Sequence, residues 1–419
     1  MKSYRLFFNP LLILLMFFIA LLESRREVLA ESNPIVNRIL IVGNEVTKEY
    51  VIKREIYTRP GGELDEDLLE EDRKRLLNLG IFSDVEFYVE SNFDGSADII
   101  VIVNERFRWL PFPAADYDEL DGWSFGAGLY HRNFRGRNET LGMAGLFGDA
   151  VQYQLIFSNP WISGDHISLQ AEFNRLKRYN KYEDFHETYQ SYEAELGRKW
   201  GEYIWGRIKL GYLRIESEEI GITTTTEFRD DIPLLQTTFI YDSRDLYINP
   251  RRGYRFTCVT GQYGFPFKEP DYRAIQLTGS RYFPIPIGRT LAFGFLFGLK
   301  SGKTPVYFRY YLGGAETVRG LSENTAKGGR LLVLTSEYRF DIIKTFNLMN
   351  RIDFGMGGLL FIESGAVWDG WEVFGNQRFH SSYGAGLRFF VPIVEAVGLD
   401  YGWTFDGSSG YEIIFQAKI

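Results

Sequence analysis

Three charged residues are the candidate functional residues of this chain. Arg319 lies in a largely polar connection over residues 301–330, and Glu337 and Glu363 follow it in the sequence. An arginine is always charged, and its rigid fork of donors pairs best with carboxylates. Two carboxylates could also act as a general acid and base, but with Arg319 as counter-ion a structural ion cluster is the favoured interpretation. The alternative is a surface turn with an incidental arginine.

The two glutamates lie on neighbouring predicted strands. Side chains alternate between the two faces of a strand, so the strand expected over 331–340 places Glu337 on the face opposite its mostly apolar side. In the strand expected over 357–368, Phe361, Glu363 and Gly365 share one face. Together with the arginine loop, this pattern predicts an ion cluster inside a polar barrel lumen.

From about residue 108 to the end, the sequence alternates with a period of two. The apolar sets are Trp123-Phe125-Ala127-Leu129, Val151-Tyr153-Leu155-Phe157, Ile167-Leu169-Ala171-Phe173 and Leu291-Phe293-Phe295-Phe297-Leu299. Small or polar residues lie between most members of these sets, and Ile156 and Leu296 are the exceptions. This is the pattern expected of strands that face lipid on one side and water on the other.

Length and connections favour a closed membrane barrel over a soluble sandwich. The length after residue 105, at roughly 20 residues per strand and connection, predicts about sixteen antiparallel strands over 107–419. Tight turns are expected near 163–164, 250–253, 284–288 and 406–410, and long polar loops at 179–188, 216–230 and 301–330. An exposed apolar band of this size is tolerable only in a bilayer.

Residues 34–106 predict a separate small α+β domain with the order β-α-α-β-β. A strand over 39–42 is followed by a helix that we expect Thr47 to cap, and Asp65 is the expected N-cap of a second helix that ends before Gly80. Two alternating strands follow over 83–90 and 97–104. The length is normal for a small domain.

Composition narrows the function classes. Aromatic residues make up 16% of the chain, and 43 glycines with 14 prolines indicate many turns, as in a large β structure. A net charge of −8 argues against a nucleic-acid partner. The single cysteine, Cys258, excludes an intramolecular disulfide, and the four histidines show no metal-ligand spacing. We find no nucleophile or phosphate loop, and therefore expect no enzyme activity, cofactor or metal.

Residues 1–30 are typical of a signal peptide. Lys2 and Arg5 precede an apolar run over 11–22, and Val28-Leu29-Ala30 resembles a cleavage site. A membrane anchor is the alternative, but the run is shorter than the roughly 20 apolar residues of a spanning helix. The sequence therefore predicts an exported protein.

The motifs in this order resemble the BamA/TamA-type outer-membrane assembly superfamily. Val318-Arg319-Gly320 is similar to its sixth-loop motif, although Leu321 follows where an aromatic residue is usual. The resemblance implies that Arg319 lies in the lumen against acidic residues of the twelfth and thirteenth strands, Glu337 and the segment Phe361, Glu363 and Gly365, where Glu363 replaces the usual aspartate. Residues 34–106 resemble the periplasmic POTRA domain of this superfamily.

A second segment matches the same superfamily at a strand end. It contains Asp242, Arg244 and Asp245, followed by Pro250 and Gly253. The other interpretation is a charged strand end that leads into a proline and glycine turn.

The first and last strands must meet in a closed barrel. The first candidate strand contains Pro111 and Pro113, which cannot donate ladder hydrogen bonds, so we predict a weak seam; alternatively, the prolines only end the pairing near a rim. The last strand, 411–419, alternates with Tyr411 and Phe415 on its outward face.

The resemblance implies an assembly factor that inserts client β-barrel proteins into the outer membrane through the seam, with POTRA-mediated client capture. The expected location is the outer membrane of a Gram-negative bacterium, with the POTRA domain in the periplasm. The implied partners are unfolded outer-membrane or secreted polypeptides and membrane lipids, together with periplasmic chaperones, accessory lipoproteins or an inner-membrane-anchored partner. The alternatives are a polypeptide exporter of the two-partner secretion type, which usually carries a plug helix and two POTRA domains, and a passive pore.

Overall fold

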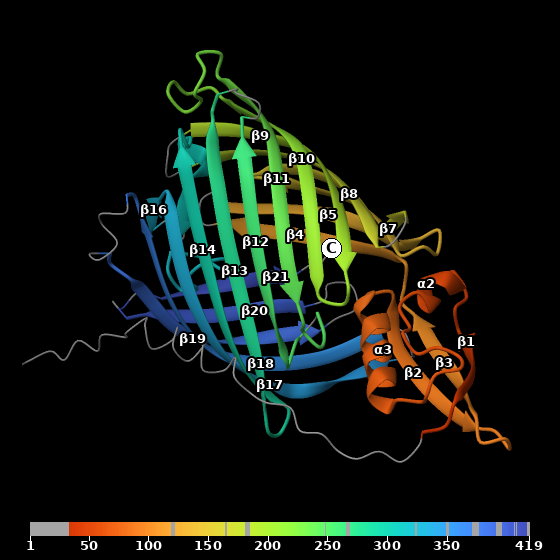
Figure 1. The fold of residues 1–419 in the computed structure, drawn as a ribbon. Coiled ribbons are helices and arrows are strands. Elements are labelled where there is room, and N and C mark those ends of the chain that lie inside the picture. Colours follow the sequence, from red (N-terminus) through yellow and green to blue (C-terminus); the bar gives the residue numbers. More distant parts are fainter. Residues whose placement is uncertain are drawn as a thin grey trace, which may run out of the picture.

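The computed structural model describes residues 33–416, apart from 119–121, 164–165, 181–184, 248, 265–268, 323–324, 349–351, 371–376, 391–395, 406 and 408. The predicted signal peptide over 1–30 lies outside these residues. A small α+β domain comes first in the chain and is followed by a large antiparallel sheet that curls round on itself (Figure 1).

The small domain has the predicted order of elements. Its elements are β1 (Val36–Val42), α2 (Glu49–Lys53), α3 (Glu66–Asn78), β2 (Phe82–Ser91) and β3 (Ala97–Glu105). The sheet order is β1-β3-β2, with β1 parallel to β3. Helix α3 begins where predicted, because the Asp65 side chain accepts from the backbone N–H groups of Asp67 and Leu68. The apolar sides of both helices pack on one face of this sheet around Ile52, Leu76 and Val101.

The expected cap of the first helix is wrong. Helix α2 begins at Glu49 after Lys48, and no side chain caps it. Thr47 instead serves a tertiary contact: its Oγ1 accepts from Asn133 Nδ2 at 2.8 Å, and its backbone N–H donates to Glu105 at 2.6 Å. The hydroxyl that would cap a helix in isolation is therefore used to join the two parts of the protein.

The large antiparallel sheet contains sixteen strands, which confirms the predicted strand number; the order runs from the first strand to the last, without a ladder between these two strands among the described residues. They are β4 (Trp109–Asp118), β5 (Gly122–Phe134), β6 (Glu139–Gly148), β7 (Val151–Ser163), β8 (Ile167–Asn180), β9 (Phe185–Trp200), β10 (Ile204–Ser217), β11 (Arg229–Asp242), β12 (Gly253–Tyr263), β13 (Tyr272–Ile285), β14 (Arg289–Gly302), β17 (Arg330–Leu348), β18 (Ile352–Trp368), β19 (His380–Phe390), β20 (Ala396–Thr404) and β21 (Ser409–Gln416). Each strand pairs with its neighbours in the chain. Among the described residues of the connections, further elements occur only in the loop between the eleventh and twelfth strands: η1 (Val306–Phe308) and the hairpin of β15 (Tyr310–Leu312) and β16 (Ala326–Gly328).

The two faces of the sheet differ as predicted. Large apolar side chains on the outer face are exposed, for example Phe125 at 59%, Leu155 at 50% and Leu210 at 60%. The inner face carries polar pairs such as Gln154 and Glu172, which are hydrogen bonded at 3.0 Å. Within the described ranges, no helix has the length and apolar character needed to cross a membrane.

One of the expected tight turns lies at the same end of the sheet as the longest loop. The order of the strands places the short connection between β20 and β21 at the same end as the long loop over 303–329. Successive connections in an antiparallel sheet alternate between the two ends. The position of a strand in the order therefore decides the end at which a turn lies, whatever the length of that turn.

The helix side of the small domain docks on turns of the large sheet. Arg75 Nη1 on α3 lies 2.9 Å from Glu202 Oε1 in the turn between β9 and β10, and Arg54 stacks over the ring of Trp161 at 4.3 Å. Asn78 brackets the connection between β11 and β12, accepting from Tyr247 N at 3.1 Å. Since the helices face the barrel turns, α3 lies between the small sheet and the large one (Figure 1).

Candidate functional site

The loop over 303–329, between β14 and β17, folds into the lumen of the sheet and packs there through its own apolar residues. Leu312, Val318 and Leu321 are almost fully buried and form a cluster with Leu331 and Val333 on the inner face of β17. This packing holds the backbone on both sides of Arg319. The loop is thus an internal element of the barrel, and the incidental surface turn is wrong.

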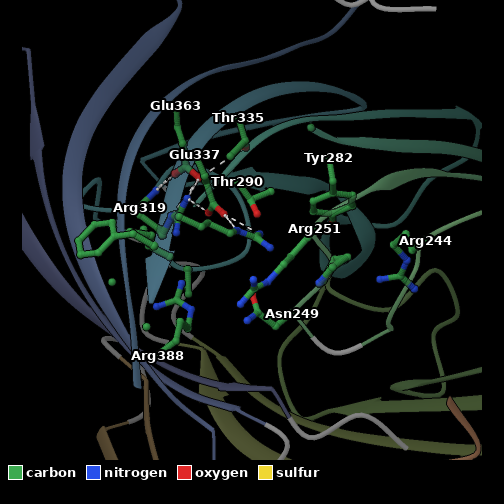
Figure 2. A pocket seen from close by; sticks show the side chains of 18 of the residues that line it. Arg244, Asn249, Arg251, Tyr282, Thr290, Arg319, Thr335, Glu337, Glu363 and Arg388 are labelled. Atoms are coloured by element: carbon green, nitrogen blue, oxygen red, sulfur yellow. Dashed lines mark hydrogen bonds and ion pairs between the residues drawn. The ribbon is translucent and has the colours of Figure 1, made fainter. Parts of the chain in front are cut away.

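Arg319 lies at the centre of a buried carboxylate cluster (Figure 2). Its side chain is 4% exposed. Nε and Nη2 donate to Glu363 Oε1 at 2.9 and 2.6 Å, and Nη2 also donates to Glu337 Oε1 at 2.7 Å. The backbone N–H of Arg319 donates to Glu363 Oε2 at 2.8 Å. Glu363 therefore holds both the side chain and the backbone of the loop tip.

Three further charged residues complete the cluster, which we call the anchor network. Nη1 of Arg319 donates to Asp400 Oδ2 on β20 at 2.7 Å. Asp400 is in turn paired with Arg388, whose Nη2 lies 2.8 Å from it, and Glu337 is paired with Arg339 at 2.6 Å. The network therefore contains three arginines and three carboxylates and is formally neutral, as a buried group of charges must nearly be.

The anchor network depends on small residues that let the loop approach the wall. The Arg319 guanidinium lies 3.9 Å from the centre of the Phe361 ring, which forms one wall of its site. A Cβ at Gly365 would lie 2.8 Å from Val318, and a Cβ at Gly320 would lie 2.6 Å from the backbone of Gly402. Gly320 also has a φ of +80°, which favours glycine. These contacts place Val318, Gly320, Phe361 and Gly365 in the same site as Arg319.

A second contact holds the neck of the loop near its start. Tyr307 Oη donates to Asp230 Oδ2 at 2.5 Å, and Asp230 is fully buried. The ring of Phe308 lies 5.7 Å from that of Tyr272, and Lys300 donates to the Phe308 carbonyl. The loop is therefore anchored at two separate places.

The charged turn motif lies at the opposite end of the lumen. Arg244 forms two hydrogen bonds with Asp242, at 2.8 and 2.7 Å, and Asp245 accepts from the backbone N–H groups of the turn, including Arg251 at 3.0 Å. At Gly253 a Cβ would lie 2.1 Å from the Ser243 carbonyl oxygen, so a side chain is excluded there.

The turn also faces the anchor network. A cavity of about 400 Å³ is lined by Arg244, Pro250 and Arg251 on one side and by Arg319 and Glu337 on the other (Figure 2). Arg251 reaches across the lumen to Asp341 on β17, at 2.6 Å. The turn motif is thus part of the lumen as well as of the contact with the small domain.

The two outermost strands of the sheet are β4 and β21, and no ladder between them is present among the described residues. Pro111 and Pro113 lie inside β4, with paired residues on both sides, so they do not end the pairing with β5. Arg132 N donates to the Arg108 carbonyl at 2.8 Å, which fixes the hydrogen-bonded positions of this ladder. Because bonded and non-bonded pairs alternate, both prolines have their backbone nitrogen on the open edge.

The open edge of β4 therefore lacks two donors and keeps the carbonyl acceptors at the same positions. On the other edge, the β21 backbone pairs Tyr411 with Tyr401 and Phe415 with Val397. The side chains of Tyr411 and Phe415 lie outside the described residues.

Three of the six residues of the anchor network are not predicted from the sequence to pair with the loop or with its partners: Arg339, Arg388 and Asp400. Arg339 lies two residues after Glu337 and so shares its face, but the sequence does not predict that the two side chains pair. Asp400 and Arg388 lie on β20 and β19, and only the register of these strands brings them level with Arg319. The alternation within each strand predicts the face of the sheet on which a side chain lies. It does not predict the position of that side chain along the barrel axis relative to side chains on other strands.

Comparisons with known proteins agree with this geometry. The family model for the Omp85 superfamily domain matches residues 133–418, and the POTRA model, described as surface antigen variable number repeat, matches residues 34–106. The outer membrane protein assembly factor BamA of Neisseria meningitidis serogroup B is 22% identical over 400 residues, covering 84% of this chain and 49% of that protein. The sorting and assembly machinery component 50 homolog B of Xenopus laevis is 25% identical over 336 residues, covering 72% and 68%.

Solved structures show the same fold. BamA from Haemophilus ducreyi lacking POTRA domains 1–3 has a TM-score of 0.58 at 18% identity, covering 91% of this chain and 83% of that one. CdiB from Escherichia coli has a TM-score of 0.63 at 11% identity, covering 92% and 75%. The chain spans about half the length of the BamA proteins it matches in sequence. With a family model that matches more than half of its residues, the chain belongs to the Omp85 superfamily.

Proposed function

We propose that this protein folds and inserts client β-barrel proteins into the outer membrane of a Gram-negative bacterium, through the seam between β4 and β21. In this proposal residues 34–106 form the periplasmic POTRA domain, residues 107–419 form the membrane barrel, and residues 1–30 direct export. Its clients are unfolded outer-membrane polypeptides, and the surrounding lipids are its second partner.

The observation that carries the proposal is the donor-poor edge of β4. In hydrocarbon an unpaired backbone group costs several kcal/mol, so an open strand edge is a strong template for another strand. Pro111 and Pro113 remove donors from this edge only and leave the ladder with β5 intact. The edge can therefore pair with β21 only incompletely, and an arriving client strand competes against a weakened closure.

The loop supports insertion at the seam rather than passage through the lumen. Arg319 and Tyr307 hold it across the interior at two points, which obstructs the path that an exported chain would take. Such a loop leaves the seam as the open route to the bilayer.

A dedicated polypeptide exporter is the second candidate, favoured by the polar lumen wall. Glu193 on β9 lies 2.6 Å from Lys209 on β10, and Glu172 lies on the same wall. A wall of this kind could pass a hydrated chain once the loop had left. Apart from the three-residue 3-10 helix η1, the described residues contain no helix inside the lumen to act as a plug.

Site-specific photocrosslinking separates the two candidates. A photoreactive phenylalanine derivative would replace Trp109, at the edge of β4, or Trp205, on the lumen face of β10, while an unfolded outer-membrane client is produced in the same cells. A matched control would replace Ile208, which faces lipid away from the seam. Insertion predicts client crosslinks at position 109 and none at 205 or 208; crosslinks at 205 alone would overturn it.

Depletion of this protein from the cell is a second, independent test that distinguishes the two candidate functions. Loss of many barrel proteins from the outer-membrane proteome is expected of an assembly factor. Loss of a single secreted protein, with the barrel proteome intact, would support the exporter.

A further inference from the structure

One face of the POTRA sheet has no covering element among the described residues. The helices pack on the side that carries Ile99, Val101 and Val103. The opposite side, which we call the free face, carries the alternate residues of all three strands. Its rows are Arg38–Asp98–Glu90, Leu40–Ile100–Tyr88, Val42–Ile102–Glu86 and Asn104–Asp84.

The centre of the free face is apolar. Leu40 is 41% exposed, and Val42 and Tyr88 are each 51% exposed. Ile100 and Ile102 lie between them and are half-buried. These five side chains form a contiguous patch across the three strands, because the register places them in adjacent rows. Such a patch, rimmed by polar groups, is typical of an interaction site.

The rim of the patch is acidic. Asp84, Glu86 and Glu90 lie on β2 with their side chains on the free face, and alternate residues of a strand are about 7 Å apart. In the described part of the chain, none of the three forms a salt bridge with a lysine or arginine. Glu86 accepts a hydrogen bond from Tyr88 Oη at 2.5 Å, and Asp84 interacts electrostatically with Arg73 on α3. Because none of the three is held in a salt bridge, each can pair with a cation of another molecule.

The fourth carboxylate of the face is already satisfied. Asp98 accepts from Asn37 at 2.7 Å, from Asn92 at 3.1 Å and from Arg38 at 2.6 Å. These side-chain hydrogen bonds lower the pKa of Asp98 below its ordinary value. Its role is to fix β1 against β3, and the three carboxylates on β2 are the ones left for a partner.

The charge of the whole chain is concentrated in this domain. Residues 34–106 contain 9 lysines and arginines against 16 aspartates and glutamates, and so carry −7 of the chain's net −8. Inside the barrel, by contrast, the carboxylates of Glu193, Glu337 and Asp400 are each paired with a cation. A second copy of this domain or an anionic lipid surface would be repelled, whereas a basic segment would be attracted.

The docking geometry leaves the free face accessible. The contacts with the barrel come from the helix side, through Arg54, Arg75 and Asn78, and from the loop before α2, through Thr47. The free face therefore points away from the barrel and into the periplasm.

We propose that the free face binds a basic amphipathic segment of a partner protein, with apolar side chains on the Leu40 to Tyr88 patch and lysines or arginines against Asp84, Glu86 and Glu90. This mode uses side chains on the face of the sheet. It leaves the strand edges free for the addition of client strands, and it holds whether the barrel inserts or exports its client.

The test is direct binding to the full-length protein in neutral lipid nanodiscs. The probe is a short fluorescent peptide in which lysine alternates with leucine, and its match has glutamate in place of lysine. We expect the lysine peptide to bind in a salt-dependent manner and the glutamate peptide not to bind. Equal binding of the two peptides, or no binding of the lysine peptide, would overturn the proposal.

A pair of charge-matched variants locates the site. Glu86→Gln with Glu90→Gln should weaken binding of the lysine peptide about tenfold. Glu66→Gln with Asp67→Asn removes the same charge from the exposed start of α3, on the helix side, and should leave the affinity within about twofold of wild type. An equal loss in both variants would show that only the net charge matters and would refute the site.

The apolar half of the site is tested separately. Leu40→Ser should weaken binding, whereas Phe93→Ser, at the exposed tip of the β2–β3 hairpin, should not. Retention of the circular dichroism spectrum shows that each variant is folded. Binding to anionic vesicles, or association of two copies that Glu86→Gln abolishes, would identify another occupant and reject the basic segment.

Discussion

Removal of the Arg319 side chain should destabilise the barrel through one carboxylate in particular. In Arg319→Ala, Glu337 keeps Arg339 at 2.6 Å and Asp400 keeps Arg388 at 2.8 Å. Among the residues that the structure describes, Glu363 has no second cation: it retains the backbone N–H of residue 319 and Thr335 Oγ1, which is 3.4 Å away. The variant therefore leaves one buried, unpaired charge rather than three.

The magnitude follows from that count. Breaking a buried ion pair by removing one partner costs about 3 to 5 kcal/mol, most of it from the charge left behind. If Glu363 is the source, neutralising it should recover most of the loss. We expect Arg319→Ala with Glu363→Gln to be about 2 kcal/mol more stable than Arg319→Ala alone, since only hydrogen bonds of about 1 kcal/mol each remain lost.

A matched control is available in the same loop. Arg309 pairs with Asp369 at 2.5 Å, but both side chains are partly exposed, at 32% and 59%. Exposed pairs contribute about 0 to 1 kcal/mol, so Arg309→Ala should have little effect. This variant controls for the loss of an arginine from the loop.

The assay is equilibrium unfolding in urea with the barrel in detergent micelles, followed by tryptophan fluorescence, with heat-modifiable gel mobility as a second readout. The expected order of stability is wild type, then Arg309→Ala, then Arg319→Ala with Glu363→Gln, then Arg319→Ala. If the double variant is no more stable than Arg319→Ala, the unpaired Glu363 is not the cause. If Arg309→Ala and Arg319→Ala lose the same amount, burial of the anchor network has no energetic consequence.

Three further predictions concern separate parts of the molecule. Gly320→Ala should unseat the loop tip, because its Cβ would lie 2.6 Å from the backbone of β20 at a φ of +80°, and trypsin should then cleave after Arg319, which is protected in the wild type. Tyr307→Phe should cost about 1.5 to 3 kcal/mol, as expected for a hydrogen bond to a charged group, and should expose the loop neck to protease without cleavage at Arg319; unchanged protection would remove Asp230 as an anchor. The lowered pKa of Asp98 stabilises the POTRA domain above the ordinary pKa of aspartate, and this stabilisation is lost as the pH falls through the lowered value, so hydrogen-exchange protection of β1 should fall below about pH 4 and Asp98→Asn should flatten that dependence.

The period of two predicted much of the fold and part of the site. It identified the strands and placed Glu337, Glu363 and Phe361 on lumen faces, because facing is a local property of the chain. It could not place Asp400 beside Arg319, since that depends on the register of three successive strand pairs. Thr47 failed for a related reason: its hydroxyl had a tertiary partner in Asn133, and no local pattern contains that information.

Most charges of the barrel wall around the loop tip are balanced within the wall itself. Arg339 and Arg388 balance Glu337 and Asp400 whether or not Arg319 is present, so the wall does not need the loop to remain neutral apart from Glu363. The neck contact at Tyr307 lies on different strands and does not share a partner with the anchor network. Release of the tip therefore leaves one carboxylate, Glu363, without its cation while the neck stays bound. The free energies of releasing the tip and of releasing the neck should be nearly additive. A tip that can leave without opening the wall is the arrangement expected where loop movement and seam opening are separate events.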